Sequence, residues 1–247
     1  MIDPVVLVVL GAVTGFLIGM TGLGGGSLLT PALLLLGLPT PVLIGTDLIT
    51  ASVTKMGASW RHHLSGTIDW KTVGLLALGS LPAGYATSLV HIDVTNLKRL
   101  LAVALILTGF AILWRWKYPP KVVKAIPIPL PLIGAVVGAL VGLTSIGSGA
   151  MLALALTFIM PQLKVSRLAG TDVAHGVLLS LVAAAGHAQH AGVDFRTVGW
   201  LLLGALPSTW IASGYAPKLP ENIARPLLGT VLSIVGTVLI LKSFSGA

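Results

Sequence analysis

The chain has 247 residues, of which 55% are hydrophobic and only 9% are charged, and its mean hydropathy is +0.99. Soluble domains carry roughly 25% charged residues, so the composition excludes a soluble fold and indicates a polytopic, all-α membrane protein. The formal net charge is +8. Because the basic residues lie in short connections between apolar blocks, they favour membrane topology and anionic lipid over nucleic acid. There is no cysteine, which excludes disulfides and thiolate chemistry.

Apolar blocks follow one another along the chain, and each is long enough to cross a bilayer, which takes about 20 residues as a helix. They span residues 4–37, 41–60, 71–90, 97–114, 127–160, 168–190, 196–216 and 223–242. The middle connection, WRWKYPPKVVKAIPIPLP, is basic and rich in proline, which is typical of a linker. We predict one integral membrane domain with a first repeat (1–116), a basic linker (117–126) and a second repeat (127–247).

The two halves match each other in sequence, which indicates an internal duplication. GAVTGFLIGMTGLGGGSLL (11–29) matches GAVVGALVGLTSIGSGAML (134–152), and IGTDLI (44–49) matches AGTDVA (169–174). DWKTVGLLALGSLP (69–82) matches DFRTVGWLLLGALP (194–207). These pairs share almost the same separation along the chain, so each repeat is expected to hold four hydrophobic blocks.

The first block of each repeat is longer than one span needs and is broken by glycines. Such a block either crosses once and continues as a half-helix, or turns at the glycines and returns to its starting side. The positive-inside rule favours the return, because that arrangement gathers more of the Lys and Arg residues on one side. Each repeat then makes an odd net number of crossings, and we expect inverted repeats with broken helices, as in many secondary transporters.

The two breaks form the predicted substrate site, because irregular backbone inside a membrane is tolerated where it lines a polar cavity. A new helix starts after each break, at Ser27 and at Ser148, and helix N-termini attract anions. Glycine allows close approach of the backbone. The predicted substrate-binding residues are Thr21, Gly24, Gly25, Gly26, Ser27, Lys55, Thr144, Ser145, Gly147, Ser148 and Gly149.

Other glycines have the GxxxG spacing of close helix contacts, for which we expect a packing role. They are Gly11, Gly15 and Gly19 in the first half, and Gly134, Gly138 and Gly142 in the second half.

Ionisable residues inside the second block of each repeat are costly to bury and are frequently functional. Asp47 and Asp172 hold the same place in the GTD motif, where each either has a site role, for example coupling transport to protons, or caps a helix start. Lys55 is the candidate partner of an anion, with pairing to Asp47 or snorkelling as alternatives. His175 either carries a proton near neutral pH or is a hydrogen-bonded core histidine.

No motif of an enzyme accompanies these residues. GxSxG, HExxH and Walker A patterns are absent from the sequence. The histidines of HAQH (187–190) have no partner cysteines or set of convergent carboxylates. We therefore predict no catalysis, no cofactor and no metal.

At these residues the chain resembles the sulfite exporter TauE/SafE family of membrane transporters. The resemblance rests on GMTGLGGGSLLTPALLLLGLP (19–39), on GTDL (45–48), on the run from Trp60 to Trp70, and on the second copy of the pattern. It covers essentially the whole chain. It implies export of small sulfur-containing anions, such as sulfite or organosulfonates, by a secondary mechanism.

Together these features predict a secondary transporter of a small anion in the bacterial inner membrane, with alternating access around the two broken helices. A passive anion channel and a carrier of small carboxylates are the alternatives. The expected partners are the anion and the lipid bilayer, with no nucleic acid; a homo-oligomer stays open. The substrate, the direction of transport and the coupling ion also stay open.

Overall fold

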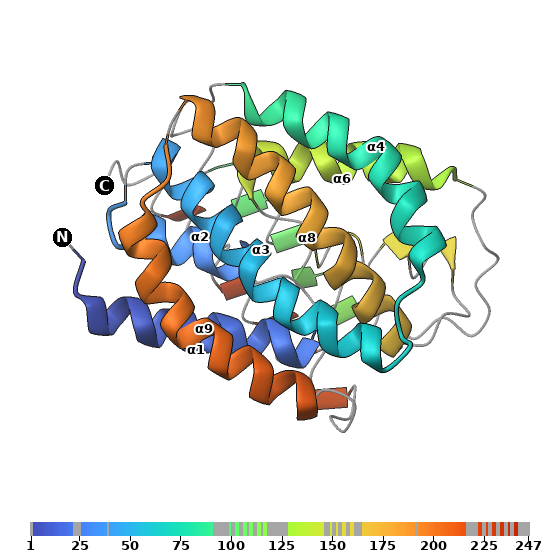
Figure 1. The fold of residues 1–247 in the computed structure, drawn as a ribbon, viewed down its shortest axis with the longest axis horizontal. Helices are drawn as coiled ribbons and strands as arrows, with labels where there is room; N and C mark the ends of the chain where they lie inside the picture. The colour runs from blue at the N-terminus through green and yellow to red at the C-terminus, as the bar shows by residue number, and fades with distance from the viewer. Residues whose placement is uncertain are drawn as a thin grey trace.

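The computed structural model describes residues 2–21, 26–38, 40–90, 128–145, 165–190 and 192–215, together with scattered positions between 99 and 117, 149 and 160, and 222 and 241. All the regular structure in these ranges is helical (Figure 1). The helices are α1 (Pro4–Thr21), α2 (Gly26–Leu35), α3 (Thr40–Leu64), α4 (Trp70–Ser88), α6 (Leu130–Thr144), α8 (Val165–His190) and α9 (Phe195–Tyr215). The prediction of an all-α fold is confirmed.

Aspartate side chains fix the starts of several helices. The carboxylate of Asp3 accepts a hydrogen bond from the backbone N–H of Val5 at 2.8 Å, at the start of α1. Asp69 accepts one from the N–H of Thr72 at 3.2 Å, at the start of α4. Asp194 caps α9 in the same way. Each carboxylate satisfies an N–H group that has no partner within the helix, which stabilises the start by about 1 kcal/mol.

Helices α3 and α8 lie side by side and run antiparallel. A Cβ atom on Gly45, near the start of α3, would lie 3.6 Å from the Cβ of His187, near the end of α8. At mid-length, the Ser52 hydroxyl donates to the Val177 carbonyl at 3.3 Å. This antiparallel pair forms the middle of the bundle, with α4 packed against α8 and α9 packed against α3.

Helix α1 packs along α9 in the same direction. A Cβ atom on Gly11 would lie 2.0 Å from the Leu201 carbonyl oxygen, and one on Gly15 would lie 2.4 Å from that of Ala205. Real Cβ atoms do not approach backbone this closely, so only glycine permits the contact. The packing role predicted for these glycines is confirmed.

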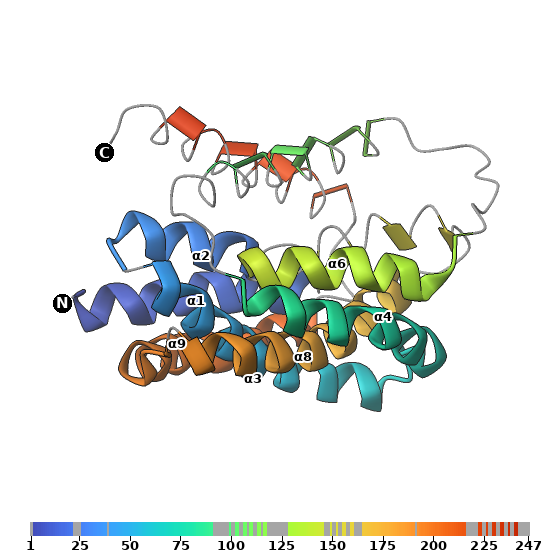
Figure 2. The same ribbon diagram turned by 90° about the horizontal axis from the view of Figure 1, so that it is seen from above.

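Helix α6 packs along α4 through equivalent glycines. A Cβ atom added to Gly134 would lie 2.1 Å from the Leu76 carbonyl oxygen, and one added to Gly138 would lie 2.2 Å from that of Ser80. Residue numbers increase together along both helices, so α6 and α4 are parallel too. Figure 2 shows the α4–α6 pair and the α1–α9 pair within one layered bundle.

The first apolar block turns back on itself. Helix α1 has the direction of α9, which runs opposite to α8, so α1 and α3 point the same way. The chain must therefore return between them, and α2 makes part of that return over 10 residues. Residues at the start of α1 (Asp3) and just after α2 (Leu38) line one pocket with Asp194, so α2 ends where α1 begins. Helix α6, parallel to α4, runs opposite to α1.

The outer surface of the bundle is apolar. Large hydrophobic side chains are exposed along α1 (Val9, Phe16), α6 (Val136) and α9 (Leu203, Ile211). Exposed apolar surface of this extent is typical of contact with lipid or another protein. In the part of the chain described, one helix (Arg167–His190) is both long and apolar enough to cross a membrane, and Pro4–Met20 and Leu130–Thr144 are shorter apolar helices.

Candidate functional site

A group of polar side chains, which we call the central cluster, is buried where α3 and α8 cross. Its ionisable members come from α3 and α8, and hydroxyl groups come from α2, α4 and the end of α6. The members are Asp47, Lys55, Asp172, His175, Thr30, Ser80 and Ser145. None is more than 3% exposed, so the bundle separates these groups from its surroundings.

Asp47 is the point at which the two broken blocks meet. Its Oδ2 atom accepts hydrogen bonds from the hydroxyl of Thr30, on α2, and from the hydroxyl of Ser145 at 2.6 Å. Ser145 ends α6 in the left-handed conformation, with φ of 60°. A carboxylate of α3 thus contacts both Thr30, after the first break, and Ser145, which ends α6 just before the predicted second break.

The capping role considered for the two aspartates is wrong. Asp47 lies well inside α3, which begins at Thr40, and Asp172 lies well inside α8, which begins at Val165. The N–H groups that a cap satisfies belong to the first turn. Both carboxylates point instead into the buried interior, where they are fully inaccessible.

Of the two buried carboxylates, Asp172 accepts fewer hydrogen bonds than Asp47. Neither of its oxygens has a hydrogen-bond partner among the described residues, whereas Asp47 lacks one only at Oδ1. The charged group that acts on Asp172 is Lys55. An isolated buried carboxylate costs several kcal/mol unless it is paired or neutralised, so Asp172 depends on that ammonium.

Lys55 is fully buried and reaches across to α8. A Cβ atom on Gly176 would lie 2.6 Å from Lys55 Nζ and 3.1 Å from its Cδ, so the ammonium rests on the α8 backbone at this glycine. It interacts electrostatically with Asp172 and Asp47, most strongly with Asp172. The snorkelling alternative is wrong, because the side chain points into the bundle. Pairing with Asp47 stays a prediction, and Asp172 is a second carboxylate that acts on Lys55.

His175 is held against α4. Its Nε2 atom and the Ser80 hydroxyl form a hydrogen bond of 2.7 Å, while Nδ1 has no partner among the described residues. This bond matches the alternative of a hydrogen-bonded core histidine. It also ties α8 to α4 at the depth of the central cluster.

The other predicted site residues have varied positions. Thr144 is buried, and its hydroxyl donates to the Leu140 carbonyl at 2.6 Å within α6. Gly149 lies in a buried turn. Thr21 ends α1, and Gly26 and Ser27 begin α2, whereas the side chains of Thr21 and Ser27 lie outside the description. The remaining four fall outside the described residues, and they are Gly24, Gly25, Gly147 and Ser148.

The sequence reasoning missed Thr30 and Ser80. Thr30 lies in the apolar run LLTPALLLL and Ser80 in LLALGSLP, where hydroxyls commonly bond only to their own helix. The position of Thr30 within the half-helix after the first break was the one available signal. Ser80 had none, because the aligned residue of the second half is Ala205.

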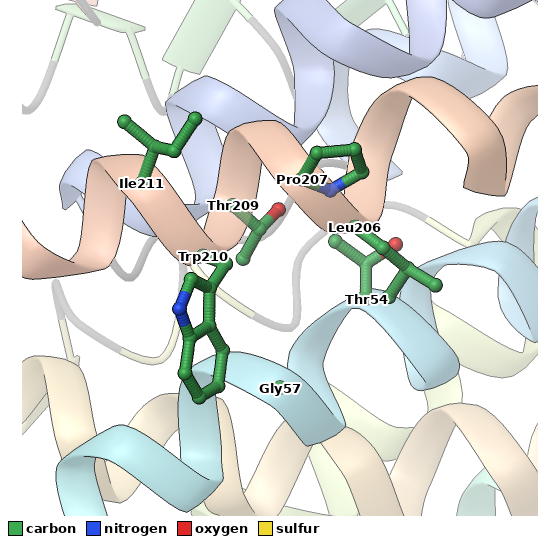
Figure 3. A pocket seen from close by; sticks show the side chains of 7 residues that line it. All are labelled: Thr54, Gly57, Leu206, Pro207, Thr209, Trp210 and Ile211. Carbon is green, nitrogen blue, oxygen red and sulfur yellow. The ribbon is translucent and has the colours of Figure 1, made fainter.

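The pocket in Figure 3 lies between α3 and α9 and has a volume of about 510 Å³. Thr54 and Gly57 line it from α3, and Trp210 reaches toward them from α9. The Thr54 hydroxyl donates to the Thr50 carbonyl at 2.7 Å, so it offers no free donor to a ligand. This pocket faces α9, whereas Lys55 faces α8. It is not part of the central cluster.

A larger pocket, of about 920 Å³, lies at the end of the bundle where α1 and α9 begin. Asp3, Asp194 and Arg196 are among its lining residues. No group of three or more metal-ligating side chains occurs within the described ranges.

Comparison of the sequence with known proteins identifies a family. The family described as "Sulfite exporter TauE/SafE" matches residues 7–239. The "Probable membrane transporter protein YjnA" of Bacillus subtilis is 34% identical, over 95% of this chain and 98% of its own length. The "Probable membrane transporter protein MJ0441" of Methanocaldococcus jannaschii is 24% identical, over 95% and 94%. No solved structure matches. The chain belongs to the sulfite exporter TauE/SafE family of membrane transporters.

Proposed function

We propose that the chain is a multi-pass secondary transporter in the bacterial inner membrane that carries a small anion, with sulfite, an organosulfonate or a related sulfur-containing anion as substrate. The observation that carries this proposal is the bridge at Asp47, which links Thr30 of α2 to Ser145 at the end of α6. Broken helices that meet at mid-membrane are where secondary transporters bind their substrates.

The proposal includes two inverted repeats. Its support is the opposite direction of α1 and α6, the antiparallel crossing of α3 and α8, and glycine contacts that recur at aligned positions. Gly11 meets Leu201, and the aligned Gly134 meets the aligned Leu76. A pseudo-two-fold axis through the α3–α8 crossing would relate the two halves and would allow one access state to be converted into the other.

In this proposal, Lys55 is the cation that binds the transported anion. It is fully buried at the α3–α8 crossing, and a buried ammonium attracts an anion strongly because water does not screen it. The start of α2 after the first break is the second positive element, because the first N–H groups of a helix have no partner within the helix and attract anions. Alternating access would expose this site to one side of the membrane at a time.

Uptake into proteoliposomes tests the proposal across sulfite, methanesulfonate, sulfate and small carboxylates. We expect saturable uptake of a sulfur-containing anion that is strongly reduced by Lys55→Ala and by Gly25→Leu. The matched controls are Lys71→Ala, at an exposed lysine, and Gly199→Leu, where added atoms meet open space. Uptake equal to that of protein-free vesicles for every anion would reject the transporter. Normal uptake by both site variants would reject the assigned site.

A further inference from the structure

We propose that the central cluster is also a proton-binding site, and that Asp172 takes up one proton when an anion binds at Lys55, so that anion and proton cross the membrane together. This inference rests on the proposed function, since it assigns the coupling ion of the same transporter.

The charges of the central cluster do not balance. Two carboxylates, Asp47 and Asp172, share the single ammonium of Lys55, and all three groups are fully buried. The hydrogen bonds of the cluster bring in neutral hydroxyls and one imidazole: Thr30 of α2 and Ser145 at the end of α6 bond to Asp47, and Ser80 of α4 bonds to His175 of α8. A further negative charge would therefore leave the centre of the bundle strongly uncompensated, which is unfavourable in a membrane interior.

The two carboxylates differ in the hydrogen bonds that they accept from the protein. Asp47 accepts two hydroxyl hydrogen bonds at Oδ2, and such bonds stabilise the ionised form. Asp172 accepts none at either oxygen, and its neighbouring charge is Lys55. Removing that ammonium from Asp172 leaves a buried charge without compensation, whereas Asp47 keeps its hydroxyl donors.

An anion at Lys55 removes the ammonium from Asp172. The incoming anion competes for the same N–H groups, so Asp172 loses its counter-charge at the moment of binding. A proton from water then forms an O–H bond with one carboxylate oxygen, and the charge of Asp172 becomes zero. The anion and the proton together add no net charge to the cluster. When the anion leaves, the proton dissociates and Asp172 pairs with Lys55 again.

A proton fits this site better than a metal cation. Lys55 Nζ already lies against the α8 backbone at Gly176, one turn from Asp172, so an ammonium occupies the space beside the carboxylate. Hard metal cations in proteins need several converging oxygen ligands, and the described hydroxyls of Thr30 and Ser145 are directed to Asp47.

The test uses the full chain in proteoliposomes that contain a pH-sensitive dye, with methanesulfonate as the probe. Methanesulfonate carries no titratable proton near neutral pH, so any proton that moves with it comes through the protein. A methanesulfonate gradient should drive protons in the same direction, in equal number with the anion, and replacement of Na⁺ by choline should change neither flux. If methanesulfonate is not carried, another organosulfonate monoanion without a titratable proton replaces it.

Asp172→Asn mimics the protonated carboxyl group. We expect this variant to carry the anion without protons, so that its uptake becomes dependent on the membrane potential. Asp47→Asn should retain proton movement, because Asp172 is intact. Asp3→Asn, at an exposed aspartate, is the matched control and should behave as the wild type.

The outcomes separate the two proposals. Anion uptake without proton movement in the wild type overturns the proton site and leaves the transporter standing, as does uptake that requires Na⁺. Proton movement that survives in Asp172→Asn also overturns the assignment. Absence of uptake for every anion overturns the transporter, and the proton site with it.

Discussion

The α1–α9 pair and the α4–α6 pair use glycines at aligned positions, whereas the centres of α3 and α8 carry different polar residues. Gly15 meets Ala205 in one pair, and Gly138 meets the aligned Ser80 in the other. At the centre, Lys55 of α3 aligns with Ser180 of α8, and His175 of α8 aligns with Thr50 of α3. The contacts that set helix spacing thus match between the halves, and so do Asp47 and Asp172, whereas Lys55 and His175 have no ionisable counterpart in the other half.

This difference assigns separate roles to the two kinds of position. Backbone contact through glycine fixes where helices lie, and it tolerates no added atom. The polar residues at the crossing need not repeat, because one ammonium can serve both Asp47 and Asp172. Paired changes at aligned positions should therefore act equally in the outer helix pairs and unequally at the crossing.

The largest effect is expected for Lys55→Met compared with Ser180→Ala. Loss of the ammonium leaves two buried carboxylates without a cation, and breaking a buried pair costs about 3–5 kcal/mol. We expect Lys55→Met to lower thermal stability strongly and to abolish anion uptake, while Ser180→Ala retains both. The double variant Lys55→Met/Asp172→Asn should recover stability but not uptake. Recovery of uptake in the double variant would show that Lys55 does not bind the anion.

Next in size is the effect of alanine at aligned glycines of the outer helix pairs. Gly11→Ala and Gly134→Ala place a Cβ atom 2.0 Å and 2.1 Å from a carbonyl oxygen. Overpacking of this kind costs about 1–3 kcal/mol, and we expect similar losses of thermal stability in both variants. Gly74→Ala and Gly199→Ala are matched helical controls, because nothing lies within 4 Å of either. Clearly unequal losses of thermal stability for Gly11→Ala and Gly134→Ala would show that the α1–α9 and α4–α6 pairs do not pack equivalently.

A smaller effect is expected for Gly176→Ala. The added Cβ would lie 2.6 Å from Lys55 Nζ, and the flexible end of the lysine can move away at little cost to folding. The aligned residue of the first half is Ala51, where a Cβ is already present. We expect the KM for the anion to rise about tenfold, equivalent to about 1.4 kcal/mol, with thermal stability close to wild type. An unchanged KM would place the anion away from Lys55.

The smallest effect concerns acid pH and the start of α9. The Thr197 hydroxyl donates to Asp194 at 2.6 Å, and this bond, with backbone N–H donors, holds the pKa of Asp194 below its usual value. The resulting stability is present above the unfolded pKa, about 4, and is lost as the pH falls through the lower folded pKa. The difference in thermal stability between wild type and Asp194→Asn should shrink with acidification below pH about 4. A difference independent of pH would contradict this.

The packing glycines could be predicted from sequence because GxxxG spacing reports helix contact directly. The helix starts at Asp69 and Asp194 also follow from local chemistry, since aspartate before a helix satisfies its first N–H groups. The predicted apolar blocks and the helices agree to within a few residues for α3, α4, α8 and α9.

The composition of the central cluster could not be predicted in full. Asp47, Lys55, Asp172 and His175 were singled out because charges in apolar blocks are rare. Their partners Thr30 and Ser80 depend on which helices meet, and α2 contacts α3 only because the chain turns back after α1. The sequences of α2 and α3 do not by themselves indicate that these helices are in contact. The position of Lys55 against α8 depends on the α3–α8 crossing and on the space left by Gly176.

Counterflow tests the central claim most directly. Proteoliposomes loaded with a high concentration of unlabelled sulfite are diluted into a trace of labelled sulfite, with methanesulfonate as a parallel substrate. A carrier with alternating access should accumulate the label transiently above its external concentration, and Lys55→Met should abolish that accumulation while Lys71→Ala retains it. A flux that only equilibrates the label would indicate a passive channel, and label entry equal to that of empty vesicles would contradict transport of these anions.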